Sequence, residues 1–176
     1  MATYEEIYGK RVEVLDADPT LTSAYEGQVW FNSASGTLKS VVKFDAWRSG
    51  GNLPAVVSAN QGCGIQTAAL CIGGFGPPPN ANYAKTEEYD GTNWTSGGTL
   101  ITARHEQAGC GTQTATLAFA GNPATTVTEG YDGSTWSTSP ATMSNARTGA
   151  AAAGSSTASF IAGGPSASAL TEEFNN

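Results

Sequence analysis

The chain has 176 residues, of which 13% are charged, with a formal net charge of −7 and a pI of about 4.5. Its eight Lys and Arg are dispersed, so the basic surface of a nucleic-acid-binding protein is missing. No apolar run approaches the roughly 20 residues of a membrane helix, which argues against membrane insertion. The 22 glycines and the many threonines favour short strands and tight turns over helices, so we expect an all-β protein.

Residues 1–43 precede the repeated part of the sequence and predict a short N-terminal β-hairpin module. The stretch from Lys10 to Pro19 begins with alternating polar and apolar residues, which predicts a strand. Residues 29–31 and 38–42 are the arms of a hairpin around a turn at 32–36. A segment this short has little core of its own, so we expect it to anchor or oligomerise the protein by packing on another surface.

Residues 44–176 contain an internal repeat. The stretch "WRSGGNLPAVVSANQGCGIQTAALCIGG" from Trp47 matches "WTSGGTLITARHEQAGCGTQTATLAFAG" from Trp94 at a constant offset, and a looser copy starts at Trp136. The three copies span 47–93, 94–135 and 136–176. The first is longer because of the insertion "GPPPNANY" (Gly76 to Tyr83), which its prolines predict to be a loop.

Each copy predicts four short strands, which in the second copy cover 107–111, 113–121, 125–132 and 133–138. Asp132-Gly133 supplies a tight turn between the last two strands. A repeated four-stranded sheet of about 40 residues is typical of β-propeller blades, which stack because one sheet cannot bury both faces. We therefore expect about three blades. Propellers have about four to eight blades, so either another subunit completes the ring, for example two chains giving six blades, or the chain continues.

The order of motifs resembles the kelch repeat from Trp47 to Asn176, with Ala120-Gly121 replacing Gly-Gly in the second copy. The residues that carry the resemblance are Trp47, Gly73, Gly74, Tyr89, Asp90, Tyr131, Asp132, Gly163 and Gly164. The sequence "AGCGTQTATLAFAG…TEGYDGSTW" is similar to kelch-like repeats in proteins of marine bacteriophages. The resemblance implies kelch-like propeller blades in a structural protein of the virion.

As the resemblance implies, the protein would be a tail fibre, spike or head-attached appendage, made in the host cytoplasm and located in the virion. Its partners would be other virion proteins, bound through the N-terminal segment, further copies of itself, and a host-surface glycan or receptor. The alternative is a free-standing carbohydrate- or protein-binding module.

Little in the sequence indicates catalysis. His105, the single histidine, is replaced by Ser58 in the first copy, which favours a surface or loop histidine over a catalytic base. The carboxylates at 87–90, 129–132 and 172–173 recur at one repeat position, so we interpret them as architecture rather than as an acid–base or calcium site. We expect no enzyme, no cofactor and no metal site, and three free thiols.

Four aromatic residues are candidates for binding, namely Phe75, Tyr83, Trp94 and Trp136. Phe75 and Tyr83 flank the insertion, and insertions in repeat proteins often map to the binding face. The tryptophans either stack on sugar rings or pack between blades, and their recurrence favours packing. Two arginines at one repeat position, Arg104 and Arg147, either pair with neighbouring carboxylates or bind backbone carbonyls.

The last copy stops on a predicted third strand, in "TEEFNN", whereas the first copy starts on a predicted outer strand at Trp47. An outer strand at Trp47 is therefore the kind of strand that would complete the sheet of the last copy. The sequence leaves open whether this completion occurs within one chain or between chains.

Overall fold

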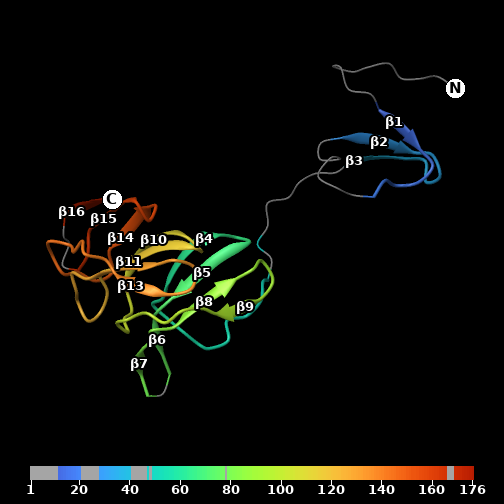
Figure 1. Ribbon diagram of the computed structural model, residues 1–176. Coiled ribbons are helices and arrows are strands. Elements are labelled where there is room, and N and C mark those ends of the chain that lie inside the picture. Colours follow the sequence, from blue (N-terminus) through green and yellow to red (C-terminus); the bar gives the residue numbers. More distant parts are fainter. Residues whose placement is uncertain (1–11, 21–27, 41–46, 48, 78, 166–168) are drawn as a thin grey trace. The chain divides into compact units, whose positions relative to one another are not determined.

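The structure is a computed structural model that describes residues 12–20, 28–40, 47, 49–77, 79–165 and 169–176. These residues form strands β1 to β16 in small open sheets, and none of them lies in a helix, which confirms the all-β prediction (Figure 1). The described part of the chain accordingly offers no helix long and apolar enough to cross a membrane. The chain divides into two compact units, Met1–Arg48 and Ser49–Asn176, whereas the sequence placed the division after residue 43.

The N-terminal unit contains a three-stranded sheet in the order β1-β2-β3. Strands β2 (Val29–Asn32) and β3 (Thr37–Ser40) form the predicted antiparallel hairpin, with Gly36 at a φ of 66° in its turn. Strand β1 (Glu13–Leu15) pairs with β2 in parallel, which the sequence pattern does not reveal. The parts of the two predicted strands at residues 10–11 and 41–42 lie outside the described residues.

The side chain of Asp18 organises this small sheet. Its carboxylate accepts hydrogen bonds from Trp30 Nε1 at 3.2 Å and from Asn32 Nδ2 at 2.7 Å. It also pairs with Lys39 Nζ at 2.6 Å. These three donors lower the pKa of Asp18 to about 2, and Trp30 is buried beside them with 5% of its surface exposed.

The second unit contains three antiparallel sheets that follow one another along the chain, which we name the first, second and third sheets. The first contains β4 (Gln61–Ile65), β5 (Ala68–Ile72), β8 (Thr86–Tyr89) and β9 (Trp94–Ser96). The second contains β10 (Ala108–Thr112), β11 (Ala115–Phe119), β12 (Thr128–Tyr131) and β13 (Trp136–Thr138). The third contains β14 (Ala151–Gly154), β15 (Ala158–Ala162) and β16 (Thr171–Asn175). Apart from the short hairpin β6-β7, the described residues of the second unit thus form two four-stranded sheets and one three-stranded sheet.

The insertion in the first repeat differs from the predicted loop. Strands β6 (Phe75–Gly76) and β7 (Ala81–Asn82) pair as a short hairpin. Pro77 and Pro79 lie in its turn, where a backbone N–H donor is not required. The prolines therefore mark only the tip of the insertion, and the residues that flank them are free to pair.

The three sheets are linked at the strand that begins each one. Strands β4, β10 and β14 lie beside one another in Figure 1, and the same backbone contact joins each pair. Glu106 N–H donates to Ala59 O at 2.8 Å, and Gly149 N–H donates to Glu106 O at 2.9 Å. These three residues occupy equivalent positions and all have a positive φ, of 51°, 52° and 61°. The same backbone contact, which we name the sheet-to-sheet step, therefore relates each sheet to the next.

Apolar side chains fill the two spaces between the sheets. Between the first and second sheets lie Leu70, Ile72, Leu100, Ala118, Tyr131 and Trp136. Between the second and third sheets lie Ala108, Cys110, Leu117, Phe119, Ala120 and Ile161, with Met143 and Phe174 packed against them. The second sheet is therefore covered on both faces.

A pair of residues with positive φ ends the second strand of each sheet. The φ values are 56° and 112° at Gly73-Gly74, 60° and 107° at Ala120-Gly121, and 78° and 132° at Gly163-Gly164. Glycine adopts this conformation without the strain that Ala120 bears. Gly74 N–H donates to Arg104 O and Gly121 N–H to Arg147 O, each at 2.9 Å. The paired residues thus turn the chain toward the following sheet.

Candidate functional site

The repeated acidic residues at the hairpin turns organise those turns. Asp132 Oδ1 accepts the backbone N–H groups of Ser134 at 2.8 Å and Thr135 at 2.7 Å. Asp90 Oδ1 accepts two N–H groups in the same way, both at 2.7 Å. The Thr135 N–H and the Ser134 side chain lower the pKa of Asp132, and the Asn93 and Thr92 N–H groups lower that of Asp90. These carboxylates are therefore bound as anions and are poor proton donors.

A second repeated carboxylate forms a buried ion pair. Arg104 and Glu129 have fully buried side chains and pair through Nη2 and Oε1. Arg104 Nη1 also donates to the carbonyls of Ala120 at 3.1 Å and Val127 at 3.3 Å. Glu129 accepts the Ile101 N–H at 2.8 Å. Both roles considered for this arginine, carboxylate pairing and backbone binding, occur together.

The third repeat contains the same arrangement in a more open setting. Arg147 pairs with Glu172, whose side chain is 20% exposed, and donates to the carbonyls of Gly163 at 3.2 Å and Leu170 at 3.1 Å. Burial opposes ionisation of Glu172, but the Ser144 N–H and the guanidinium lower its pKa below the usual value. This pair therefore ties the third sheet to the segment that leads into it.

The first repeat lacks this pair because two of its residues differ. Val57 stands at the position of the arginine, and Pro54, which has no N–H, stands at the position of Ile101. In the part of the chain that the structure describes, Glu87 accepts a hydrogen bond from Ser96 Oγ at 3.1 Å, but no arginine lies beside it. Glu87 is 8% exposed and borders a small cavity with Val57. Its carboxylate therefore lacks the compensation that its two counterparts have.

The candidates at the insertion hairpin are engaged in contacts within the chain. The rings of Phe75 and His105 lie 5.2 Å apart, and His105 Nδ1 lies 2.7 Å from Asn82 Oδ1. Lys85 Nζ lies 5.0 Å from the ring centre of Tyr83. His105 thus joins the hairpin to the second repeat, and it has an amide rather than a carboxylate beside it.

The tryptophans have three different environments. Trp136 is 8% exposed, stacks on Tyr131 at 4.9 Å and donates its indole N–H to Thr86 Oγ1 at 2.9 Å. Trp94 is half-buried and stacks on Tyr89 at 4.8 Å. Trp47 belongs to the N-terminal unit and is exposed within it, so the packing predicted for Trp47 stays a prediction. Trp136 serves packing, because its ring has no free face for a sugar.

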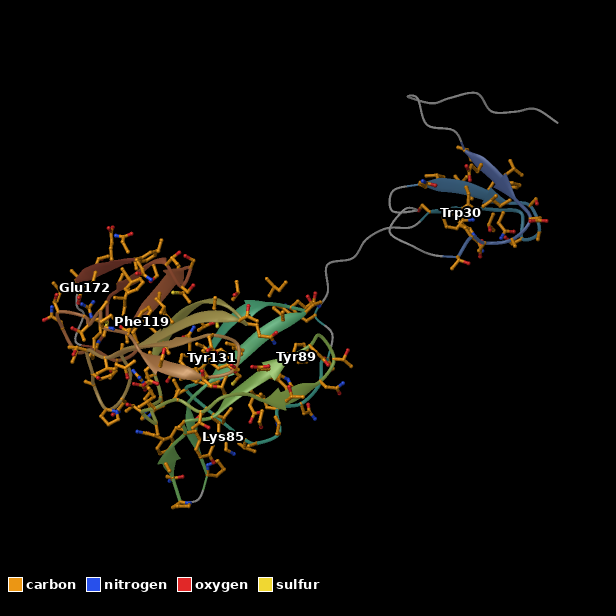
Figure 2. The ribbon with its side chains drawn as sticks, in the orientation of Figure 1. Trp30, Lys85, Tyr89, Phe119, Tyr131 and Glu172 are labelled. Atoms are coloured by element: carbon orange, nitrogen blue, oxygen red, sulfur yellow. The ribbon has the colours of Figure 1, made fainter. Side chains whose placement is uncertain are left out.

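A groove of about 160 Å³ lies between the second and third sheets. Phe119 and Thr128 of the second sheet border it, together with Met143 and with Ile161 and Phe174 of the third sheet. Phe119 and Glu172, which also borders the groove, are labelled in Figure 2. Sequence reasoning missed this groove, because the residues that line it come from two different repeats.

Metal and thiol chemistry find little support in the described residues. Within them, no three His, Cys, Asp or Glu side chains are grouped closely enough to hold a metal ion. Cys63, Cys71 and Cys110 are free, and burial raises the pKa of each thiol. Such thiols stay protonated near neutral pH and are weak nucleophiles.

Comparison with known proteins adds no assignment. No protein-family model matches the chain, and no curated protein matches it. The function proposed for the chain therefore rests on its repeated sequence and on the contacts described above.

Proposed function

We propose that this chain is a non-enzymatic structural protein of a bacteriophage virion, as a tail fibre, spike or head-attached appendage. Its second unit is a set of kelch-like propeller blades used for attachment or host-surface recognition. The observation that carries the proposal is that one sheet-to-sheet step, made by the backbone contacts of Ala59, Glu106 and Gly149, recurs along the chain. Repeated stacking of small antiparallel sheets is the way propellers are built.

The use of the repeated polar groups supports a structural role. Asp90 and Asp132 bind turn amides, and the two arginines bind carboxylates and carbonyls within their own repeats. His105 faces Asn82 and Phe75. These groups maintain the architecture, and this use favours a scaffold over a catalyst.

The placement in a virion is supported by the sequence resemblance, and it has a direct test. Particles of the phage whose genome encodes this sequence would be labelled with gold-conjugated antibody against the chain and imaged in negative stain. The expected result is label at a fixed place on intact particles, with the N-terminal unit bound to another virion protein. Particles that carry no label, although the antibody detects the chain in infected cells, would refute the virion assignment.

The alternative, a free-standing carbohydrate- or protein-binding module, is favoured by the insertion hairpin. Strands β6 and β7 interrupt the repeat and bring Tyr83 and Lys85 together beside it. A glycan array probed with the isolated protein tests this alternative. Binding that is lost in Tyr83→Ala with an unchanged unfolding midpoint would support it, and binding equal in the variant would count against this surface.

A further inference from the structure

We propose that copies of this chain associate head to tail, and that the groove beside the third sheet receives Trp47 of a second copy. The inference deepens the proposed function, because it names the surface through which the propeller blades assemble and rests on that blade architecture.

The groove has the composition of a site that a tryptophan already fills elsewhere in the molecule. Trp136 packs against Ile72, Leu100, Ala118 and Tyr131 between the first and second sheets. The repeat places Phe119, Met143, Ile161 and Phe174 at the four equivalent positions, and all four border the groove. The groove is thus the equivalent, one sheet further along, of the space that Trp136 occupies.

The polar partner of the indole is repeated as well. Trp136 Nε1 donates to Thr86 Oγ1 at 2.9 Å. Thr128 is the equivalent residue of the second sheet and borders the groove. A tryptophan in the groove would therefore find an acceptor for its N–H, which a buried indole requires.

Trp47 is the residue with the sequence context to enter this groove. "WRSGG" from Trp47 matches "WTSGG" from Trp94, which forms the outer strand of the first sheet. In the strand registers, Trp94 lies opposite Tyr89 and Trp136 lies opposite Tyr131. Phe174 on β16 holds the corresponding position and would lie opposite Trp47. Within its own N-terminal unit, Trp47 is exposed.

The residues after Trp47 already follow the path that continues from an outer strand to the next sheet. Gly98 N–H donates to the Tyr131 hydroxyl of the second sheet at 3.2 Å. Gly51 N–H donates in the same way to the Tyr89 hydroxyl of the first sheet, at 3.4 Å. The chain therefore approaches the first sheet as it would from the outer strand of a preceding sheet, and in a head-to-tail pair that sheet is the third sheet of the partner.

The two outer faces of the sheet array complement each other in the same arrangement. Phe160 on the third sheet is 44% exposed, whereas its equivalents Leu70 and Leu117 are 1% and 5% exposed because the next sheet covers them. The first sheet presents Tyr89 and Trp94, which are half-buried. Their equivalents on the second sheet are core residues that face the preceding sheet. Stacking the first sheet of one copy on the third sheet of another would cover all three side chains.

A head-to-tail contact uses two different surfaces, so it forms a ring if the rotation closes. Each copy contributes three sheets of the repeated type. Two copies would then give six sheets, within the usual range of about four to eight propeller blades. The second copy thus supplies both the tryptophan and the covering face.

The test is the oligomeric state of the full chain, measured by sedimentation velocity over a wide range of concentrations. We expect concentration-dependent association of the wild-type chain, weakened at least roughly tenfold in Trp47→Ala, because buried aromatic anchors dominate interface energies. Val56→Ala is the matched control, because Val56 is 77% exposed and its repeat equivalents are alanines. It should leave association unchanged. The thermal unfolding midpoint of dilute Trp47→Ala should equal that of the dilute wild-type chain.

Three results would overturn the inference. A wild-type chain that stays monomeric throughout would do so, as would association equal in Trp47→Ala and wild type. The third is buried Trp47 fluorescence, seen as the difference between wild type and Trp47→Phe, in a chain that stays monomeric, because the groove would then hold the chain's own segment. None of these results affects gold labelling of particles, so this inference and the virion assignment fail separately.

Discussion

The strongest prediction concerns the buried pair of Arg104 and Glu129. Arg104→Met keeps the approximate length and apolar stem of the side chain but removes the guanidinium. It leaves Glu129, whose side chain is 0% exposed, with only backbone N–H donors at 2.8 Å and 3.2 Å. Breaking a buried ion pair from one side costs about 3–5 kcal/mol, because the remaining charge stays buried without its counter-ion. This is a large fraction of the roughly 5–15 kcal/mol that stabilises a domain.

Arg147→Met is the matched variant, since it removes the same contacts from an equivalent position. Glu172 is 20% exposed, so water can solvate its carboxylate once the guanidinium is gone. The expected loss is smaller, about 1–3 kcal/mol, the range for hydrogen bonds to charged groups. The two variants therefore separate the effect of burial from the effect of the contact itself.

The assay is equilibrium unfolding in urea, followed by tryptophan fluorescence. Trp136 lies between the first and second sheets, so its emission reports unfolding near the Arg104 pair. The double variant Arg104→Met/Glu129→Met should recover much of the stability that the single variant loses, because no charge is left buried. A loss in Arg104→Met no larger than that in Arg147→Met, or a double variant as unstable as the single one, would refute the reasoning.

Three further predictions use the same measurements. Val57→Arg gives Glu87 the guanidinium that its counterparts have, and it should raise the stability of the second unit by roughly 1 kcal/mol in urea unfolding; a destabilised variant would show that the cavity cannot admit the side chain. Trp136→Ala should cost about 3–5 kcal/mol in the same assay, because it empties the space between two sheets; an unchanged midpoint would contradict the core role. Asp18 has a folded pKa of about 2, below the ordinary value of 3.8 for this side chain, so its stabilisation is present above pH 3.8 and is lost as the pH falls toward 2. We expect the fluorescence of Trp30, which donates to Asp18, to change as the pH falls toward 2. Asp18→Asn should remove this change, and an acid transition equal to that of the wild type would assign the change to another group.

The strands of the repeat were predictable because their signals are local. The alternation of side chains in 113–121 predicts the second strand of the second repeat, and Asp132-Gly133 predicts the turn between its third and fourth strands. The structure confirms this turn, with Gly133 at a φ of 93°. The sequence could place these carboxylates at the turns for the same reason, since Asp132 binds residues only two and three positions away.

The remaining features depend on contacts between distant residues. Arg104 and Glu129 are 25 positions apart, so the sequence could offer pairing only as one of two roles for the arginine. The parallel pairing of β1 with β2 has no period that distinguishes it from antiparallel pairing. Trp47 shares its sequence context with Trp94, but a sequence pattern cannot show which sheet Trp47 packs against.

The positions at which the repeats differ lie at the two ends of the array. The second repeat has a complete sheet, a fully buried ion pair and a core on both faces. A sheet whose outer face stays in contact with water is expected to be polar on that face. The third sheet instead leaves Phe160 exposed and a groove beside Phe174, and the first sheet leaves Trp94 half-buried. Both outer surfaces therefore resemble, in their exposed apolar side chains, the faces that another sheet covers inside the array.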